Sequence, residues 1–307
     1  MIVWNQRGPL PESFRGGAVT IGNFDGVHRG HAEIVACAKR LAAARGGPTV
    51  VFTFDPHPAQ VLRRDAAPIP LTTTARKAEL LESLGVDCLV AYPTDRAFLH
   101  YDAESFFRRV LCDDLAAKAI VEGRDFRFGR GREGDIATLA RYCESAGIVF
   151  QVVEPLVEDG QVISSSRVRA LLAAGEVDKA RGLLTQPYRL SGTVAVGAQR
   201  GRTLGFPTAN LSATATLIPG EGIYAAMAHV AQGTFPAAVS LGPNVTFDET
   251  ERKIEVYLID FSGDLYGRPL SVDFLSRLRD IKRFDSTEAL IHQMKADVEQ
   301  VRAIVSP

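Results

Sequence analysis

The residues with the clearest chemical potential form one segment near the N-terminus, which reads Gly22-Asn23-Phe24-Asp25-Gly26-Val27-His28-Arg29-Gly30-His31. An apolar run that predicts a strand ends where this segment begins, and a helical pattern begins within it. The junction of a strand and a helix N-terminus offers free backbone N–H groups and the positive end of the helix dipole to an anion. The glycines let a phosphate approach the backbone closely. The segment therefore predicts a phosphate-binding turn.

The two histidines of this segment, His28 and His31, are three positions apart and can share one side of the first helical turn. There both imidazoles can hydrogen-bond a triphosphate. A metal-binding pair and two plain surface residues are the alternatives for such a spacing. The strand, the glycines and the helix in register favour the phosphate role.

A run of serines followed by two arginines predicts a second phosphate contact, at Ile163-Ser164-Ser165-Ser166-Arg167-Val168-Arg169. Serines at a helix start offer caps and hydroxyl donors, and the arginine fork matches phosphate. Helix capping alone is an alternative explanation of the serines. The histidines and the arginines can bind the same triphosphate if the fold brings both segments to one sheet edge.

Two further stretches of the first half follow predicted strands. Residues 55–58 form an Asp-Pro-His-Pro sequence, in which His57 is either a substrate contact or part of a rigid exit turn. Residues 123–129 are either a simple loop or a ligand-binding loop, because Phe126 and Phe128 alternate there with an arginine. That alternation suits stacking and charge contacts to an aromatic ligand.

The second half carries a glycine-rich loop followed by Pro207-Thr208-Ala209-Asn210. Glycines at 192, 197, 201 and 205 make a permissive loop whose backbone amides can wrap phosphates, although such loops are also common between strands. The chain contains no Gly-x-x-x-x-Gly-Lys-Ser/Thr sequence, which excludes a P-loop kinase. Glu255 stands on an alternating run, Lys253–Phe261, where a lone glutamate is usually a solvated side chain.

Taken together, these stretches resemble one family over nearly the whole chain. Residues 22–31 look like the His-x-Gly-His motif of the nucleotidylyltransferase superfamily, in the form found in bacterial bifunctional riboflavin kinase/FMN adenylyltransferases, also called FAD synthetases. Residues 54–58, 123–135 and 163–169 are similar to further motifs of that family, with Ser166 in place of a threonine. The Pro-Thr-Ala-Asn sequence resembles the riboflavin kinase signature, and Glu255 matches the catalytic glutamate of that family.

The resemblance implies a role for each matching residue. It implies that Glu255 takes the proton from the ribityl 5′-hydroxyl as this oxygen attacks the γ-phosphorus of ATP, while Thr208 and Asn210 hold Mg²⁺ or another divalent cation. The residues implied in catalysis of adenylyl transfer are His28, His31 and Arg169. The residues implied in nucleotide or phosphate binding are Gly22, Phe24, Asp25, Gly26, Gly30, Ser164, Ser165, Ser166, Arg167, Gly201, Arg202, Gly205 and Pro207. The residues implied in flavin binding are His57, Asp125, Phe126, Phe128, Arg279 and Phe284.

Several positions of the second half depart from the family pattern. They are the loop Ala198-Gln199-Arg200, the turn Gly242-Pro243-Asn244-Val245-Thr246-Phe247, Tyr257 in place of a common histidine, and Ile281 at a position that is often acidic. None of these changes removes the threonine, asparagine or glutamate assigned to the kinase. We expect them to affect flavin affinity and kinase rate rather than the existence of the activity.

The elements that must position these residues change character near residue 186. In the first half, strand runs at 18–21, 49–54, 88–92, 119–121 and 148–153 alternate with helical patterns at 32–44, 75–84, 103–115 and 133–146. This alternation implies a Rossmann-like α/β domain, with a parallel sheet between helices. Short helices follow at 167–174 and 176–187. Strand runs at 188–196, 223–230, 235–240, 253–261 and 270–278 then predict an antiparallel β-barrel with a terminal helix at 286–304. The expected domains are 1–186 for FMN adenylyl transfer and 187–307 for riboflavin phosphorylation.

The composition agrees with two globular domains, because the 307 residues are 46% hydrophobic and 23% charged. Thirty-five Lys and Arg balance 36 Asp and Glu, so no global charge points to nucleic acid or an anionic membrane. Four scattered cysteines without a Cys-x-x-Cys pair suit reduced thiols in a cytosol. The N-terminus has no signal pattern, and no run reaches about 18 apolar residues. We expect a soluble cytoplasmic protein, a monomer or weak homo-oligomer, whose partners are riboflavin, FMN, FAD and ATP.

Three functions remain to be distinguished. The first is an ATP-dependent enzyme that phosphorylates riboflavin to FMN and adenylylates FMN to FAD with release of pyrophosphate. The second is a flavin-binding or regulatory protein whose kinase half has lost turnover. The third is a nucleotidyltransferase for another substrate, which the Pro-Thr-Ala-Asn module disfavours because such an enzyme has no need of a riboflavin kinase half.

Overall fold

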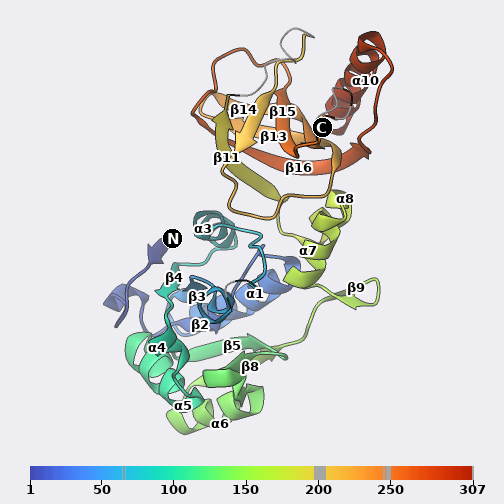
Figure 1. The fold of residues 1–307 in the computed structure, drawn as a ribbon. Helices are drawn as coiled ribbons and strands as arrows, with labels where there is room; N and C mark the ends of the chain where they lie inside the picture. The colour runs from blue at the N-terminus through green and yellow to red at the C-terminus, as the bar shows by residue number, and fades with distance from the viewer. Residues whose placement is uncertain (64, 66, 197–204, 245, 247–249, 306–307) are drawn as a thin grey trace. The chain divides into compact units, whose positions relative to one another are not determined.

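The computed structural model describes residues 1–63, 65, 67–196, 205–244, 246 and 250–305. The chain forms two compact units, Met1–Ser164 and Ser165–Pro307. The first contains a parallel sheet with helices, and the second contains a closed barrel (Figure 1). The α/β and β-barrel architecture predicted for the two halves is therefore confirmed.

The sheet of the first unit has six strands, and every neighbouring pair in it is parallel. Across the sheet the strands follow the order β1 (Ile2–Trp4), β4 (Cys88–Pro93), β3 (Thr49–Asp55), β2 (Ala18–Ile21), β5 (Ala119–Gly123) and β8 (Val149–Val153). All four residues of β2 are buried, as expected for a central parallel strand that is covered on both faces.

Helices cover both faces of this sheet. On one face lie α1 (Arg29–Ala43) and α3 (Thr74–Ser83), where Val35 and Leu81 pack against Val51. The other face is covered by α4 (Arg96–Leu99), α5 (Ala103–Phe106), the π-helix η3 (Phe107–Asp114) and α6 (Ile136–Ala146). The predicted helix over 103–115 is thus divided into an α-helical and a π-helical part.

Small elements complete the first unit. They are η1 (Glu12–Phe14), α2 (Pro58–Leu62), η4 (Arg130–Arg132) and the two short hairpins β6 (Arg127–Phe128) with β7 (Gly134–Asp135) and β9 (Val157–Glu158) with β10 (Gln161–Val162). Each is too short to give a periodic hydrophobic signal, which is why the sequence did not predict them.

The order of the strands creates a switch point beside β2. From β2 the chain adds β3 and β4 on one side, whereas β5 and β8 lie on the other side. At such a point the loops that leave two neighbouring strands run in opposite directions, which opens a crevice at the carboxyl ends of the strands. The histidine-containing turn follows β2, and the loop over 123–129 follows β5, so both border this crevice.

The second unit begins with two helices and continues as the barrel. The helices are α7 (Ser165–Ala173) and α8 (Val177–Leu183). The barrel closes in the order β11 (Arg189–Ala195), β12 (Ala209–Ser212), β15 (Lys253–Leu258), β14 (Gly233–Gly242), β13 (Gly222–Val230) and β16 (Pro269–Arg279), with every pair antiparallel. The backbone N–H of Arg277 in β16 donates to Asp178 in α8 at 3.1 Å, so α8 is attached to the barrel.

The strands of the barrel alternate between its interior and its outer surface. In β15, Ile254, Val256 and Leu258 are buried, while Glu255 and Tyr257 are half-buried on the outer surface. The terminal helix α10 (Thr287–Val305) packs on this outside, through a cluster that includes Val301 and Tyr257. Figure 1 shows α10 beside the barrel strands.

Helices α7 and α8 precede residue 186, the predicted domain boundary, yet they belong to the second compact unit. The first unit ends at Ser164, before both helices. The division of the two activities at residue 186 remains a prediction.

Candidate active sites

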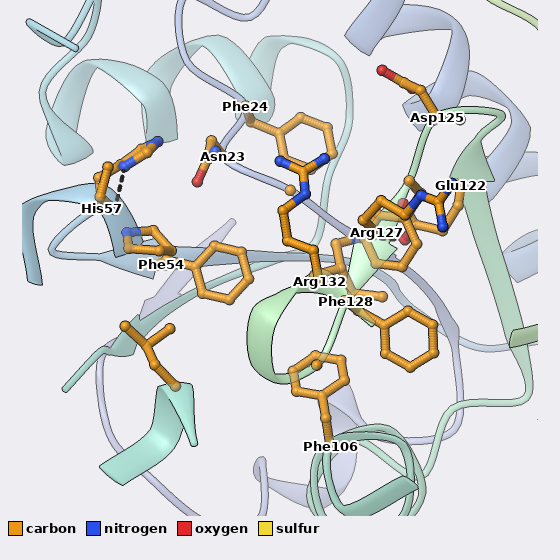
Figure 2. Close-up of a pocket in the computed structure, with 18 of the residues that line it drawn as sticks. Asn23, Phe24, Phe54, His57, Phe106, Glu122, Asp125, Arg127, Phe128 and Arg132 are labelled. Carbon is orange, nitrogen blue, oxygen red and sulfur yellow. Dashed lines mark hydrogen bonds between the residues drawn. The ribbon is translucent and has the colours of Figure 1, made fainter. Parts of the chain in front are cut away.

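A cavity of about 800 Å³ opens at the carboxyl ends of β2, β3 and β5, where the strand order switches. Its walls come from the loops after these strands and from α2, α4 and η4 (Figure 2). Of the predicted site residues, the cavity is lined by Gly22, Phe24, His31, His57, Asp125, Phe126 and Phe128. The fold therefore brings the predicted phosphate-binding turn, residues 22–31 (the phosphate turn), and the predicted flavin-binding residues of the first half to one place.

The phosphate turn is tightly built around its two histidines. His28 is the N-cap of α1, and its Nδ1 accepts a hydrogen bond from the backbone N–H of His31 at 3.3 Å. The two imidazoles stack with their centroids 3.6 Å apart, and the ring of Phe24 lies 4.8 Å from that of His31. A Cβ at Gly30 would lie 3.2 Å from the His28 ring, so glycine keeps room for the stacked pair.

Burial keeps both imidazoles neutral. It lowers the pKa of His28 to about 4, and it lowers the pKa of His31 well below its usual value, with further contributions from His28 and Lys77. A neutral imidazole has one N–H donor and one acceptor nitrogen. Because Nδ1 of His28 is the acceptor in the cap, its Nε2 carries the proton and can donate to a phosphate oxygen.

Asp25 supports this turn through its carboxylate. It accepts hydrogen bonds at 3.0 Å from the backbone N–H groups of Leu71 and Thr72 and from the Thr72 hydroxyl. These bonds attach the turn to the segment that leads into α3. The predicted contact of Asp25 with the nucleotide remains a prediction, whereas its anchoring of residues 71 and 72 is a structural role that the sequence did not indicate.

A buried lysine next to this turn, Lys77, was not predicted from the sequence. The ammonium of Lys77 donates to the Thr53 hydroxyl at 3.1 Å, and that hydroxyl donates to the carbonyl of Asn23 at 3.2 Å. Burial lowers the pKa of Lys77, and the charges of Asp25 and Asp55 oppose this effect. Lys77 lies on the apolar face of α3, one turn before Leu81. A lysine among the apolar positions of a helix was the signal in the sequence that could have identified it.

A buried acid at the end of β5, Glu122, was also missed. Its side chain is only 2% exposed, lines the cavity and accepts a hydrogen bond from the Ile21 N–H at 2.6 Å. Burial raises the pKa of Glu122 well above its usual value, which favours the protonated carboxyl. A glutamate that directly continues the apolar run 119–121 was the signal that could have found it.

Aromatic rings line much of the cavity, as Figure 2 shows. Phe126 and Phe128 stack with centroids 5.6 Å apart and an interplanar angle of 11°. Phe54 and Phe106 contribute to the same cavity. Such rings offer a planar aromatic ligand favourable stacking and edge contacts.

His57 stands at the start of α2, where its Nδ1 accepts a hydrogen bond from the Ala59 N–H at 3.0 Å. It is therefore a helix cap, while its ring also lines the cavity. Both interpretations that the sequence left open for this residue are compatible with its position.

The serine and arginine motif spans the point along the chain where the first unit ends and the second begins. Ser164 ends the first unit, and Ser165, Ser166, Arg167 and Arg169 belong to α7 in the second unit. None of the five lines the cavity. Their action on a triphosphate remains a prediction.

In the barrel, the structure brings two of the predicted kinase residues together. Asn210 in β12 and Glu255 in β15 are directly opposite each other in an antiparallel pair. Opposite residues of such a pair have Cβ atoms about 4.5–5.5 Å apart on the same face of the sheet. Thr208 precedes β12, and Ala209 between the two polar residues is buried. Thr208 and Asn210 therefore face the outer surface on which Glu255 lies.

Parts of the predicted kinase site lie outside the described residues. These are Gly201, Arg202, the loop 198–200, and Val245 and Phe247 of the altered turn. Gly205 has a φ of +84°, in the left-handed region that favours glycine, and Pro207 follows shortly after it. Phe206 between them makes an edge contact with Tyr257, with ring centroids 5.3 Å apart.

The two predicted flavin contacts at the C-terminal end of the barrel meet each other. Arg279 makes a bidentate ion pair with Asp297 of α10, with distances of 3.0 and 2.7 Å. Its guanidinium carbon also lies 5.8 Å from the centroid of the Phe284 ring. The guanidinium thus anchors α10 to the barrel, and flavin binding by Arg279 and Phe284 remains a prediction.

The donors available to a metal ion are oxygen atoms. In the part of the chain that the structure describes, no group of three or more His, Cys, Asp or Glu side chains is arranged to hold a metal. The Thr208 hydroxyl and the Asn210 amide are hard oxygen donors that fit Mg²⁺, which commonly completes its coordination with water and substrate phosphates. The site therefore fits a magnesium ion that arrives with a nucleotide.

Comparison with known proteins covers both halves of the chain. A family model described as FAD synthetase matches residues 10–167, and one described as riboflavin kinase matches residues 184–305. A crystal structure described as a macrolide-efflux protein from Streptococcus pneumoniae has a TM-score of 0.87 and 32% identity, and the match covers 98% of this chain and 99% of that chain. Among the described residues of this chain, no helix is long and apolar enough to cross a membrane.

Two curated relatives carry the same descriptive name, bifunctional riboflavin kinase/FMN adenylyltransferase. The protein from Pseudomonas fluorescens is 37% identical over 300 residues, which is 97% of this chain and 96% of the relative. The protein from Escherichia coli K12 is 35% identical over 283 residues, which is 92% of this chain and 90% of the relative. The resemblance inferred from the motifs is confirmed, and this chain belongs to the family of bifunctional riboflavin kinase/FMN adenylyltransferases.

Proposed function

We propose that this protein makes FMN from riboflavin and then FAD from FMN, with ATP as co-substrate in both steps. The observation that carries this proposal is that the two family models match successive parts of the chain, 10–167 and 184–305. The cavity at the switch point and the Asn210–Glu255 pair supply one candidate site in each part.

For the second step, we place adenylyl transfer in the cavity of the first unit. An oxygen of the FMN phosphate attacks the α-phosphorus of ATP, the bond from that phosphorus to the bridging oxygen breaks, and pyrophosphate leaves. The N–H groups of neutral His28 and His31 hydrogen-bond the reacting phosphates, where donors already in place stabilise developing charge. Their stacking, and the cap at His28, hold both rings in position before the substrate arrives.

For the arginines of α7 we keep the role that the family resemblance implies. Arg167 and Arg169 would bind the triphosphate, because guanidinium groups match phosphate oxygens in charge and geometry. The aromatic walls, with Phe126 and Phe128, would hold the isoalloxazine ring. Pairs of aromatic rings in such contact contribute about 0.5–1.5 kcal/mol beyond the burial of their area.

For the first step, we assign general-base catalysis to Glu255. Its carboxylate accepts the proton of the ribityl 5′-hydroxyl while the oxygen attacks the γ-phosphorus, and ADP leaves. Thr208 and Asn210 would hold Mg²⁺, which when bound neutralises charge on the ATP phosphates. Because Asn210 is opposite Glu255, the base and the phosphate-binding residues share one outer surface of the barrel.

We place the enzyme in the cytoplasm, as a monomer or weak homo-oligomer. All four cysteines, Cys37, Cys88, Cys112 and Cys143, are free, which fits a reducing compartment. Burial raises the pKa values of Cys88 and Cys143 to about 12, so these thiols stay protonated and unreactive.

The proposal is tested by incubating purified protein with riboflavin, ATP and Mg²⁺ and separating the flavins over time. We expect FMN to appear first and FAD to follow. Riboflavin that remains unphosphorylated while supplied FMN is converted to FAD would identify a protein whose kinase half has lost turnover. No flavin conversion at all would contradict the proposal.

A further inference from the structure

A short turn after β6 projects an arginine into the cavity of the first unit. The turn runs through η4, where Gly129, Gly131 and Arg132 have φ values of +75°, +63° and +61°. Glycine adopts such angles readily, but an arginine does so at a cost, since its Cβ crowds the backbone. A left-handed residue that is not glycine persists only where its surroundings fix it, and such residues are often found at functional sites.

The surroundings of this turn fix it from two sides. The N–H of Arg130 donates to the carbonyl of Tyr101 at 2.8 Å, and the carboxylate of Glu133 accepts from the N–H of Ala103 at 2.9 Å. A Cβ at Gly129 would lie 2.7 Å from the nitrogen of Ala103, so the turn is packed directly on the start of α5. The strained position of Arg132 is therefore imposed by the fold.

The side chain of Arg132 is directed into the cavity. It is one of the lining residues, and Figure 2 shows its guanidinium reaching into the space bordered by Phe24, His57 and Glu122. The nearby Arg127 is paired with Asp135 at 3.4 Å, and Arg124 is paired with Glu154 at 2.8 Å. Among the described residues, by contrast, no carboxylate is paired with Arg132.

An unpaired guanidinium in a cavity with aromatic walls suits a ligand that combines a planar ring with an anionic group. The fork of an arginine matches the oxygens of a phosphate monoester, and such charge-assisted bonds are stronger than neutral ones. Arg132 follows Phe126 and Phe128 along the chain, whereas the histidines that face the triphosphate begin α1. The turn that carries Arg132 is therefore continuous with the loop of Phe126 and Phe128.

We propose that Arg132 binds the phosphate of the acceptor and makes adenylyl transfer selective for a phosphorylated flavin over the same ring without phosphate. This inference rests on the proposed function, because it assigns one group of the FMN molecule to one side chain. It also gives a reason for the strained backbone, which directs the guanidinium into the cavity.

The test compares the Arg132→Ala variant with the parent in FAD formation from FMN and ATP. A charged hydrogen bond contributes about 1.5–3 kcal/mol, which corresponds to a factor of about 10–100 in affinity. We expect the KM for FMN to rise by about that factor, while the KM for ATP and the rate of riboflavin phosphorylation stay within about twofold. Inhibition by lumiflavin, which has the flavin ring without a phosphate or ribityl hydroxyls, should not change.

Two controls separate this role from others. Arg130→Ala removes a charge from the same turn at a residue that does not line the cavity, and it should leave the KM for FMN unchanged. Arg132→Gly relieves the left-handed strain, so it should raise the thermal midpoint of the first unit and still raise the KM for FMN. A variant that is stable but binds FMN poorly excludes a purely structural role.

Several outcomes would overturn the inference. A rise in the KM for ATP alone would assign Arg132 to the nucleotide, and equal weakening of FMN and lumiflavin would assign it to the ring. Arg63→Ala removes another cation from the cavity wall. If it raises the KM for FMN as much as Arg132→Ala does, the cavity attracts the phosphate by its general positive charge and Arg132 forms no specific subsite. If the parent forms no FAD, the proposed function fails. The phosphate subsite is then tested separately, by measuring the equilibrium affinities of the parent and of Arg132→Ala for FMN and for lumiflavin. If Arg132→Ala keeps the preference of the parent for FMN over lumiflavin, the subsite is contradicted.

Discussion

At the scale of single residues, burial sets the protonation of the groups around the cavity. His28 is buried and neutral, with its pKa lowered from 6.5 to about 4, whereas burial raises the pKa of Glu122. The two shifts make the stability of the first unit depend on pH in opposite ways. The single tryptophan of the chain, Trp4, lies in β1, so its fluorescence reports the unfolding of the first unit.

The first prediction concerns His28. Its folded pKa lies below its unfolded value, so the unfolded state binds more protons as the pH falls from 6.5 towards 4, and stability is lost over that window. The expected loss reaches about 3 kcal/mol near pH 4. In His28→Asn, which keeps an N-cap acceptor but does not titrate, the free energy of unfolding in urea, followed by Trp4, should depend less on pH, and the remaining dependence comes from His31, whose pKa burial also lowers. If the free energy of unfolding of the variant changes with pH between 6.5 and 4 as steeply as that of the parent, groups other than His28 cause the pH dependence.

The second prediction concerns Glu122. Its folded pKa lies above its unfolded value, so its contribution is fully present below the unfolded pKa of about 4.5 and is lost as the pH rises through the folded pKa. Glu122→Gln keeps an acceptor for the Ile21 N–H and cannot ionise. The variant should therefore be more stable than the parent at pH 8 and nearly equal to it at pH 4. Thermal midpoints followed by Trp4 at both pH values test this, and a variant that is less stable than the parent at pH 8 would contradict the raised pKa of Glu122.

Residue types and spacing were enough to predict the chemistry of the histidine turn, because strand, glycines and imidazoles are adjacent in the sequence. They were not enough for Lys77, Glu122 and Arg132. Each of these becomes informative only through tertiary contacts, namely a hydroxyl of β3, an N–H of β2, and the turn packed on α5. Short-range patterns contain no information on such contacts.

At the scale of elements, strong hydrophobic runs predicted the main strands of both units, and weak ones were missed. β1 has three residues, too few for a pattern, and β12 begins within the Pro-Thr-Ala-Asn sequence, where polar residues hide the alternation. Pairing with neighbours forms these strands: β1 adds to β4, and β12 joins β11 to β15. Closure of the barrel therefore depends on a strand that local sequence did not reveal.

The third prediction concerns the attachment of α10 to the barrel. Asp297 is 4% exposed, pairs with Arg279 and accepts from the Gln293 amide at 2.9 Å. Asp297→Ala leaves the largely buried guanidinium without its carboxylate, and breaking such a pair costs about 3–5 kcal/mol. Hydrogen exchange should become much faster in α10. The matched variant Arg302→Ala, which removes an exposed ion pair with Asp260, should change it little. If the amides of α10 exchange equally slowly in Asp297→Ala and Arg302→Ala, the anchoring role of Asp297 is contradicted.

At the scale of the whole molecule, the two candidate sites use separate residues. The cavity is lined by residues of the first unit alone, and Asn210 and Glu255 belong to the second. We therefore expect that each reaction can be removed without the other, and that FMN released by one molecule can serve another. The family was predictable from the sequence because its motifs occur in both halves.

The most direct test of two sites in one chain uses the variants His31→Ala and Glu255→Gln, alone and mixed, with riboflavin, ATP and Mg²⁺. Loss of one phosphate donor should slow FAD formation about 10²–10³-fold, and loss of a general base should slow FMN formation about 10²–10⁴-fold. His31→Ala should therefore accumulate FMN, Glu255→Gln should convert only supplied FMN, and an equal mixture should restore FAD synthesis from riboflavin. Loss of both steps in either stably folded variant, or a mixture that makes no FAD, would contradict the account.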